Sequence, residues 1–505
     1  MRRWVLVLSI IGLVWVAFLV TQERLESGEL AVKELGAIHR NAQTSAAGLG
    51  ALVVQHRGRL RPLGAFARDI VEAITGDARA VGVEQVLVVL SWTLCPEEWA
   101  SVPILKVAPR FVEESGITGN RVGKITRASP KDISEALANS EKKGPGARRA
   151  AMRLAKFNSL ARDLKMLPSP QSSDWVELGG AGSEAYPDIA SSMHLMTEAL
   201  KSRDAERFRE AAGLLQTAVL AAAGRKYPAG WRLRLELLHA KLDPVGGLSI
   251  LYLLTGILYG LSLLRVPGFR LARPGSIFLT ICVAVHALVV GWRSLVAQRF
   301  MASNTYEYVL LATIVTGVVA LRLQVSRREA LFGFLGTTLS GLALGLVVLS
   351  PISGKVSPLV PVLQSEWLRY HVGAAAIAYG LLYLSFGLAL SYFILFARAS
   401  AEQRAWVYGI ILRLIRIGFF FLTLGIITGA VWADRAWGRY WGWDPKESWS
   451  LVAWCVYAAA LHLRLGPTWL SRRWVFVLTS IFGFLAILFT FIGVNYILSG
   501  LHSYS

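Results

Sequence analysis

The chain has 505 residues, of which 54% are hydrophobic and only 17% are charged, a composition that excludes an ordinary soluble enzyme. Its formal net charge of +20 could indicate a nucleic-acid partner. However, residues 21–245 hold 31 basic and 26 acidic residues, a net charge of +5, and the remaining net charge of +15 belongs to the apolar part. We therefore expect an integral membrane protein that contacts the lipid bilayer and binds no nucleic acid.

The three cysteines exclude two further classes of site. Cys95, Cys282 and Cys455 are far apart, and none of them belongs to a Cys-x-x-Cys pair. The sequence therefore predicts neither a zinc site nor thiol-exchange chemistry by this chain's own cysteines.

The N-terminal half begins with an apolar segment and continues as mixed polar sequence. Trp4–Val20 follows Arg2 and Arg3 and is about long enough to cross a bilayer. Because no small-residue cleavage site follows, we interpret residues 1–20 as a transmembrane anchor rather than a removed signal peptide. Residues 21–245 predict a mainly helical domain.

The C-terminal half, residues 246–505, contains eight further apolar runs. With the anchor they predict an all-α polytopic membrane protein of about nine transmembrane helices, because strand edges in lipid would leave backbone groups unpaired. The runs are centred near Leu254, Ala284, Ile314, Gly341, Tyr383, Leu424, Tyr457 and Ala486.

The distribution of Arg and Lys in the short loops predicts the orientation. A cytoplasmic N-terminus leaves 15 basic residues of the membrane part inside and 7 outside. The 21–245 domain, the loop after the seventh span and the C-terminus are then extracytoplasmic. Residues 231–244 alternate leucine with charge, which indicates an amphipathic helix on the outer membrane surface.

Two histidines fall at the outer ends of predicted spans. His371 begins the sixth span and His502 follows the ninth, so both flank the loop after the seventh span. A neutral imidazole is a strong axial ligand of haem iron, and two of them from opposite sides complete its coordination. The alternative is that both are interface residues reaching for water.

Two other histidines fall inside predicted spans. His286 lies in the middle of the third span, and His462 lies toward the inner end of the eighth. Ionisable groups at membrane depth are costly and usually face a cavity, a partner or a cofactor. The alternative, stronger for His286, is a neutral histidine hydrogen-bonded to a neighbouring helix.

The loop between the seventh and eighth spans contains "WGRYWGWDPKESW", residues 437–449. Haem is a wide aromatic plane with two propionate anions, so a haem site needs flat apolar side chains and cations. Asp444 before Pro445 predicts a helix start, which makes Asp444 as much a capping residue as a ligand contact. The alternative is a membrane-interface aromatic belt. The candidate haem contacts are Trp437, Trp441, Trp443, Trp449, Arg435, Arg439 and Lys446.

The stretch "GAVWADRAWGRYWGWDPKESWSLVAW" resembles the tryptophan-rich WWD signature, here residues 432–449, of the cytochrome c biogenesis proteins called CcsA or ResC. Four other motifs match the same family in the same order, and together they cover residues 247–505. They are "SNTYEY" from Ser303, "LQSEWLRYHVG" from Leu363, "LHLR" from Leu461 and "GVNYILSGLHSY" from Gly493.

The resemblance implies a haem-handling protein of the bacterial cytoplasmic membrane that joins a ResB-type (CcsB) partner in a system II cytochrome c synthase. Haem b, as cargo, would be presented to the Cys-x-x-Cys-His motif of an apocytochrome c. By motif, His371 and His502 match the family's external iron ligands, and His462 matches its histidine within the membrane. The second membrane histidine belongs to the partner in this family, so the resemblance supports His286 in that role only weakly.

Three other protein classes share some of these features. A CcmC or CcmF protein would have the aromatic loop, but the "YWGWDPKESW" form and nine spans fit CcsA better. A membrane b-type haem electron-transfer subunit would pair histidines inside the membrane, and a transporter would carry charges at mid-membrane. The segment "VVQHRGRLRPLGAFARD", residues 53–69, resembles a stretch of some longer CcsA-like proteins and implies no established chemistry.

Overall fold

A computed structural model gives the fold of residues 35–498. The positions within this range that it does not describe are 37, 40–47, 118, 123–124, 140–143, 170–173, 179–185, 243, 265–273, 302, 328, 351, 353, 357–358, 360, 395–399, 464–471 and 495–497. The predicted anchor, residues 1–20, and His502 lie outside the described residues. The chain divides into an N-terminal unit, Glu23–Leu242, and a C-terminal unit that contains Asp243–Ser505.

The N-terminal unit contains two small antiparallel sheets that the sequence analysis did not predict. The first sheet has the order β2-β1-β6-β7, and the second has the order β3-β5-β4. Each strand has only three or four residues, too few to show the alternation that identifies a strand in sequence. The strands are β1 (Val53–His56), β2 (Arg59–Pro62), β3 (Leu105–Val107), β4 (Asn120–Val122), β5 (Ile125–Ala128), β6 (Lys165–Pro168) and β7 (Trp175–Glu177).

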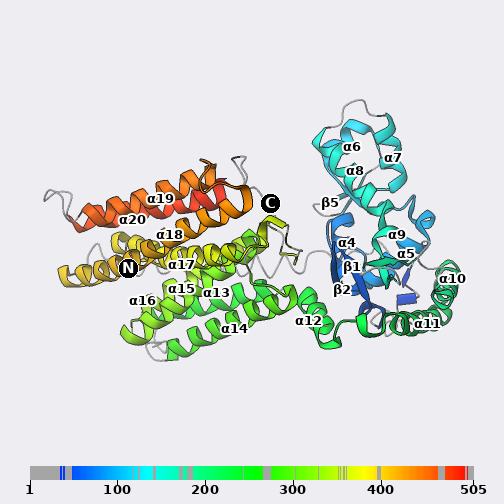
Figure 1. The fold of residues 1–505 in the computed structure, drawn as a ribbon, viewed down its shortest axis with the longest axis horizontal. Helices are drawn as coiled ribbons and strands as arrows, with labels where there is room; N and C mark the ends of the chain where they lie inside the picture. Colours follow the sequence, from blue (N-terminus) through cyan, green and yellow to red (C-terminus); the bar gives the residue numbers. More distant parts are fainter. Residues whose placement is uncertain are drawn as a thin grey trace. The chain divides into compact units, whose positions relative to one another are not determined.

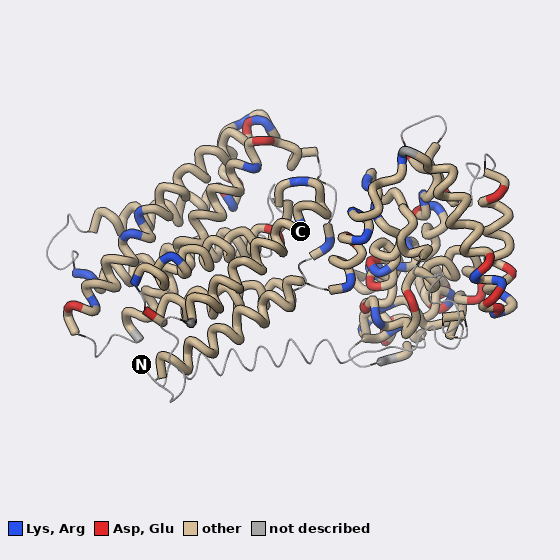
Figure 2. The backbone as a smooth tube through the Cα atoms, turned by 90° about the horizontal axis from the view of Figure 1, so that it is seen from below, with Lys and Arg blue, Asp and Glu red and all other residues tan. Residues whose placement is uncertain are grey.

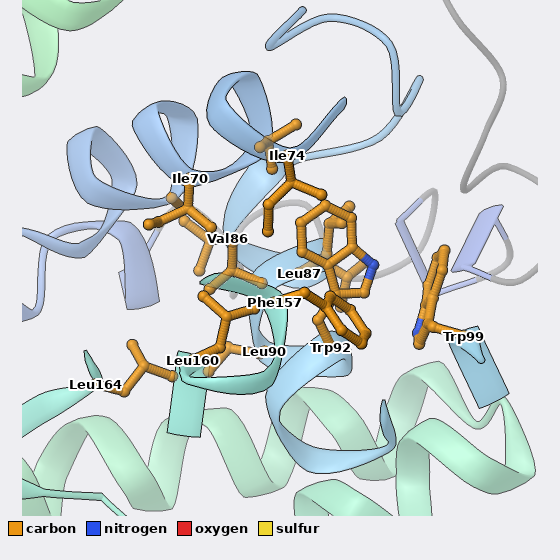
Figure 3. Packing of buried hydrophobic residues seen from close by; sticks show 14 of the residues in the cluster. Ile70, Ile74, Val86, Leu87, Leu90, Trp92, Trp99, Phe157, Leu160 and Leu164 are labelled. Carbon is orange, nitrogen blue, oxygen red and sulfur yellow. The ribbon is translucent and has the colours of Figure 1, made fainter. Parts of the chain in front are cut away.

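Helices make up more of this unit than strands and enclose its core. Figure 3 shows Trp92 packed among Ile74, Phe157 and Trp99. Each of these four residues comes from a different helical element. Helices thus predominate in the described part of this unit, beside the two sheets. The helices are α4 (Leu63–Thr75), α5 (Gln85–Leu94), η1 (Pro96–Trp99), α6 (Pro109–Ser115), α7 (Pro130–Asn139), α8 (Pro145–Asn158), α9 (Leu160–Asp163), α10 (Pro187–Ser202), α11 (Ala205–Ala223), η3 (Gly224–Lys226) and α12 (Gly230–Lys241).

The segment 53–69 forms a hairpin followed by the start of α4, and it holds α12. The turn between β1 and β2 uses two residues with positive φ, Arg57 at 53° and Gly58 at 77°, as a tight hairpin requires. Arg59 and Arg61 then both pair with Glu236, which is buried on α12. Residues 231–241 are thus helical as predicted, and one face of α12 packs on its own unit.

The C-terminal unit is built from helices in its described part (Figure 1). Figure 2 shows that charged residues are sparse along these helices and more frequent in the N-terminal unit. The helices are α13 (Pro244–Leu263), α14 (Pro274–Ala297), α15 (Thr305–Arg327), α16 (Ala330–Leu349), η4 (Pro361–Leu363), α17 (Glu366–Ile394), α18 (Ala401–Trp437), α19 (Pro445–His462), α20 (Arg473–Leu488) and the π-helical turn η6 (Phe489–Gly493).

Seven helices in the described part of the chain are long and apolar enough to cross a membrane, which identifies an integral membrane protein. They match seven of the eight runs predicted in this half of the chain. The eighth run corresponds to α19, a helix of 18 residues that is less apolar because its first turn carries Lys446 and Glu447. With the N-terminal anchor outside the described residues, the total of nine spans stays a prediction.

The spans pack closely where small residues face each other. α17 packs along α18, α13 along α16, and α15 against both α16 and α17. At the α15–α17 contact, a Cβ atom on Gly380 would lie 2.5 Å from the carbonyl oxygen of Ala312, so only glycine permits this approach. Such close backbone contact is how membrane helices gain van der Waals packing without a hydrophobic driving force.

Candidate functional site

The tryptophan-rich loop connects the end of α18 to the start of α19. α18 has 37 residues and ends at Trp437, and the φ of 71° at its C-cap, Gly438, allows the Gly438 N–H to donate to the carbonyl oxygen of Asp434 at 2.7 Å. At about 1.5 Å per residue this helix is longer than a bilayer core is thick. The loop therefore sits at the end of one long helix.

Asp444 caps α19 as the sequence predicts. Its carboxylate accepts a hydrogen bond from the backbone N–H of Lys446 at 3.0 Å, and Pro445 is the first helical residue. Glu447 completes the capping box by accepting from the N–H groups of Gly442 at 2.8 Å and Asp444 at 3.2 Å. These bonds fix the loop to the helix and give Asp444 a structural role.

Trp443 occupies a costly backbone conformation. Its φ is 55°, in the left-handed region that a bulky side chain rarely adopts, and its side chain is 70% exposed. The indole of Trp441 meets it edge to face, with 5.8 Å between ring centroids. The loop thus presents a large aromatic side chain at the expense of backbone strain.

His371 is held against the C-terminal third of α18. Its Nδ1 lies 2.7 Å from the carbonyl oxygen of Gly425, and because a carbonyl only accepts, a neutral ring making this bond carries its hydrogen on Nδ1 and its lone pair on Nε2. A Cβ atom on Gly429 would lie 2.6 Å from Nδ1, so the imidazole packs directly on the backbone of α18. A carbonyl on Nδ1 is the usual partner that orients a metal-binding imidazole.

Two tryptophans of α18 extend this arrangement. The buried ring of Trp432 stacks on His371, with 6.1 Å between centroids and an interplanar angle of 11°. Trp437 then meets Trp432 edge to face at 4.9 Å. His371, Trp432 and Trp437 therefore form one aromatic group at the junction of α17 and α18.

The other predicted contact residues are found in different settings. Trp449 packs on Phe489 of the π-helical turn, with 4.2 Å between ring centroids. Arg435 and Arg439 are exposed cations, and Lys446 is half-buried in the first turn of α19. Of the predicted cations, Arg439 therefore lies in the loop itself, whereas Arg435 and Lys446 lie in the helix turns that flank it.

The predicted membrane histidines are not brought together. His286 is fully buried on α14 and lies 3.2 Å from the hydroxyl of Tyr252, which is the hydrogen-bonded alternative foreseen in the sequence. His462 is exposed at the last residue of α19, roughly 25 Å along that helix from the loop. α14 packs with α13, α15 and α16, whereas α19 packs with α18 and α20.

Sequence reasoning missed a buried ion-pair cluster. Glu307, at 0% exposure in the first turn of α15, pairs with Arg293 of α14, also at 0%, and with Arg299. Trp432 was missed as well, although it lies in the same motif as Trp437. The sequence did contain a signal for this cluster: Glu307 belongs to the "SNTYEY" motif, and a charged residue inside a span usually has a partner or a function.

The profile of the cytochrome c assembly protein family matches residues 302–502, which include α17, α18, the loop and α19. Protein NrfI of Wolinella succinogenes is 30% identical over 507 aligned positions, which cover 92% of this chain and only 55% of that relative. The cytochrome c biogenesis protein CcsA of Guillardia theta is 32% identical over 51% of this chain and 93% of its own length. CcsA of Prochlorococcus marinus subsp. pastoris is 32% identical over 52% of this chain and 93% of its own length.

The residues matched by the family profile include His371, Trp432 and the tryptophan-rich loop. The similarity to NrfI also reaches into the N-terminal unit, because it covers 92% of the chain. The chain belongs to the CcsA family of cytochrome c biogenesis proteins.

Proposed function

We propose that this protein binds haem at the extracytoplasmic face of its membrane and presents the haem for covalent attachment to an apocytochrome c. The observation that carries the proposal is the setting of His371, with Nδ1 bonded to Gly425 and its ring stacked on Trp432. That tautomer leaves Nε2 as the metal-binding nitrogen, and the aromatic neighbours suit a porphyrin. In this proposal His371 and His502 hold the iron of haem b.

The loop would hold the porphyrin. The exposed indole of Trp443, with Trp437, Trp441 and Trp449, offers flat apolar contacts, and Arg435, Arg439 and Lys446 offer charge-assisted hydrogen bonds to the propionates. Because the capping box ties Asp444 and Glu447 to α19, the loop presents these side chains from a fixed base. Asp444 therefore supports the site without touching the ligand.

The attachment itself needs little from this chain beyond positioning. Addition of a cysteine S–H across a haem vinyl group forms the S–C bond and places the hydrogen on the neighbouring carbon, so no net oxidant is consumed. Holding the vinyl groups near the thiols of a Cys-x-x-Cys-His motif supplies much of the rate. A ResB-type partner would complete this system II synthase, and His462 would bind haem on its way through the membrane.

Replacing the two histidines tests the proposal. We expect His371→Ala and His502→Ala each to lose bound haem in the purified full-length protein and to stop cytochrome c maturation, measured by absorption spectroscopy with and without a ResB-type partner. Added imidazole should partly restore each single variant, because it refills the vacated coordination position. His194→Ala, an exposed histidine of α10, is the matched control.

Two outcomes would contradict the ligand assignment. An unchanged haem absorbance spectrum in the double variant excludes both residues as iron ligands. A loss that no concentration of imidazole repairs leaves the histidines with a structural role alone.

A further inference from the structure

The buried cluster on α14 and α15 has a second set of contacts, which the proposed function does not use. Besides pairing with Glu307, the guanidinium of Arg293 donates from Nη1 to the carbonyl oxygen of Gly354 at 2.7 Å, and its Nη2 lies 3.5 Å from that of Lys355. The same guanidinium lies 4.8 Å from the ring centroid of Tyr306. Arg293 therefore joins two helices to the segment that follows α16.

Glu307 is saturated by its partners. Its Oε1 accepts from Arg293 at 3.2 and 3.3 Å and from Arg299 at 3.2 Å. Its Oε2 accepts from Arg299 at 2.9 Å and from the hydroxyl and N–H of Ser303 at 2.8 and 3.0 Å. Two buried guanidinium groups against one carboxylate leave one positive charge in excess, and the carbonyl groups of the segment supply the compensating dipoles.

Described residues between α16 and α17 also contact the aromatic group. We call residues 354–356, 359 and 361–365, which the structure describes there, the strap. Further along it, the carbonyl oxygen of Val362 accepts a hydrogen bond from Nε1 of Trp432 at 3.2 Å. Leu363 of the strap packs in one buried cluster with Trp432 and with Leu368 of α17. Trp432 in turn stacks on His371.

We infer that Arg293 is a positioning residue: anchored by Glu307, it fixes the strap that holds Trp432 and thereby orients His371. A buried ion pair is weak evidence for stability, because a well-packed apolar pair often serves as well. What the guanidinium provides here is its fork, which meets a carboxylate on one side and a backbone carbonyl on the other. The last step of the inference, from Trp432 to haem, rests on the proposed function.

Replacing Arg293 tests the anchor without leaving a lone charge. In Arg293→Met, Glu307 keeps Arg299 and Ser303 as partners, so the helix ends remain paired. We expect the backbone amides of the strap, Pro361 excepted, to exchange hydrogen roughly tenfold faster in the haem-free full-length protein. Arg293→Lys keeps the charge but not the fork and should fall between wild type and Arg293→Met.

Two other variants separate positioning from general destabilisation. Gln324→Met breaks a different buried bond of α15, from the N–H of Gly333 to Gln324 Oε1 at 3.1 Å, and should leave strap exchange unchanged. Gly354→Ala keeps the ion pairs but places a Cβ atom 2.9 Å from the ring of Tyr306, so it should displace the strap as Arg293→Met does. Both strap variants should weaken haem binding about tenfold and shift the Soret band, whereas Gln324→Met should not.

Two measurements test the inference independently: hydrogen exchange of the strap, and haem binding with its Soret band. Exchange of the strap amides that stays within about twofold of wild type in Arg293→Met, or that rises equally in Gln324→Met, overturns the anchor. A loosened strap with an unchanged Soret band and haem affinity overturns the positioning of His371. If instead His371→Ala itself keeps the wild-type spectrum, the proposed function fails, and the exchange arm in haem-free protein still decides the link between Arg293 and the strap.

Discussion

At the scale of single residues, the candidate site depends on contacts that leave no spare volume. His371 donates to the carbonyl oxygen of Gly425 and lies against Gly429, both on α18. The two glycines are one helical turn apart, so they form a surface on which only a small side chain leaves room for the imidazole. The identity of Gly429 is therefore as important to the site as that of His371.

Substituting this glycine gives a prediction at the same scale. We expect Gly429→Ala to push the imidazole off its carbonyl partner and lower haem affinity by at least about tenfold, although alanine favours a helix over glycine by about 1 kcal/mol. Gly409→Ala, also in α18 but with no atom within 4 Å of the added Cβ, is the matched control and should bind haem normally. Haem titration and thermal unfolding of both variants check this, and normal titration of Gly429→Ala would contradict it.

At the scale of elements, the start of α19 was accessible to local sequence reasoning, whereas the sheets of the N-terminal unit were not. Asp444, Pro445 and Glu447 are adjacent in sequence and specify a capping box by their own chemistry. β1 and β6, in contrast, pair across more than a hundred residues at Gln55 and Lys165, and neither strand is long enough to announce itself.

The cap allows the two interpretations of Asp444 to be separated. Asparagine caps a helix about as well as aspartate, whereas alanine costs about 1 kcal/mol. We expect Asp444→Asn to keep both stability and haem binding, and Asp444→Ala to lower the unfolding temperature and weaken haem binding together. Loss of haem in Asp444→Asn at unchanged stability would show instead that the carboxylate contacts the ligand.

At the scale of the whole molecule, the sequence predicted the spans and the loop, but not what joins them. The apolar runs identify helices because a bilayer permits little else. The contacts that set the site, from Trp432 to Val362 and from Arg293 to Gly354, join residues 70 and 61 positions apart. Such contacts follow from helix packing, to which a single sequence gives no direct access.

The N-terminal unit should lose stability in acid. Burial, with the nearby charges of Lys156 and Arg57, lowers the pKa of His56 to about 4. Because the unfolded chain binds this proton near pH 6.5, its share of stability is complete above pH 6.5 and is lost as the pH falls toward 4.

We therefore expect the unfolding temperature of this unit to decrease between pH 7 and pH 5. His56→Gln should make that decrease smaller. Thermal unfolding of the full-length protein at several pH values would measure the difference. An identical slope in the variant and the wild type would assign the acid sensitivity to other groups.

The backbone of Trp443 implies a conflict between durability and use. Glycine adopts a φ of 55° without cost, whereas a bulky residue there costs of order 1 kcal/mol or more. Trp443→Gly should consequently raise the unfolding temperature and weaken haem binding. A search for thermostable variants of this chain would then select against the very indole that the loop exposes.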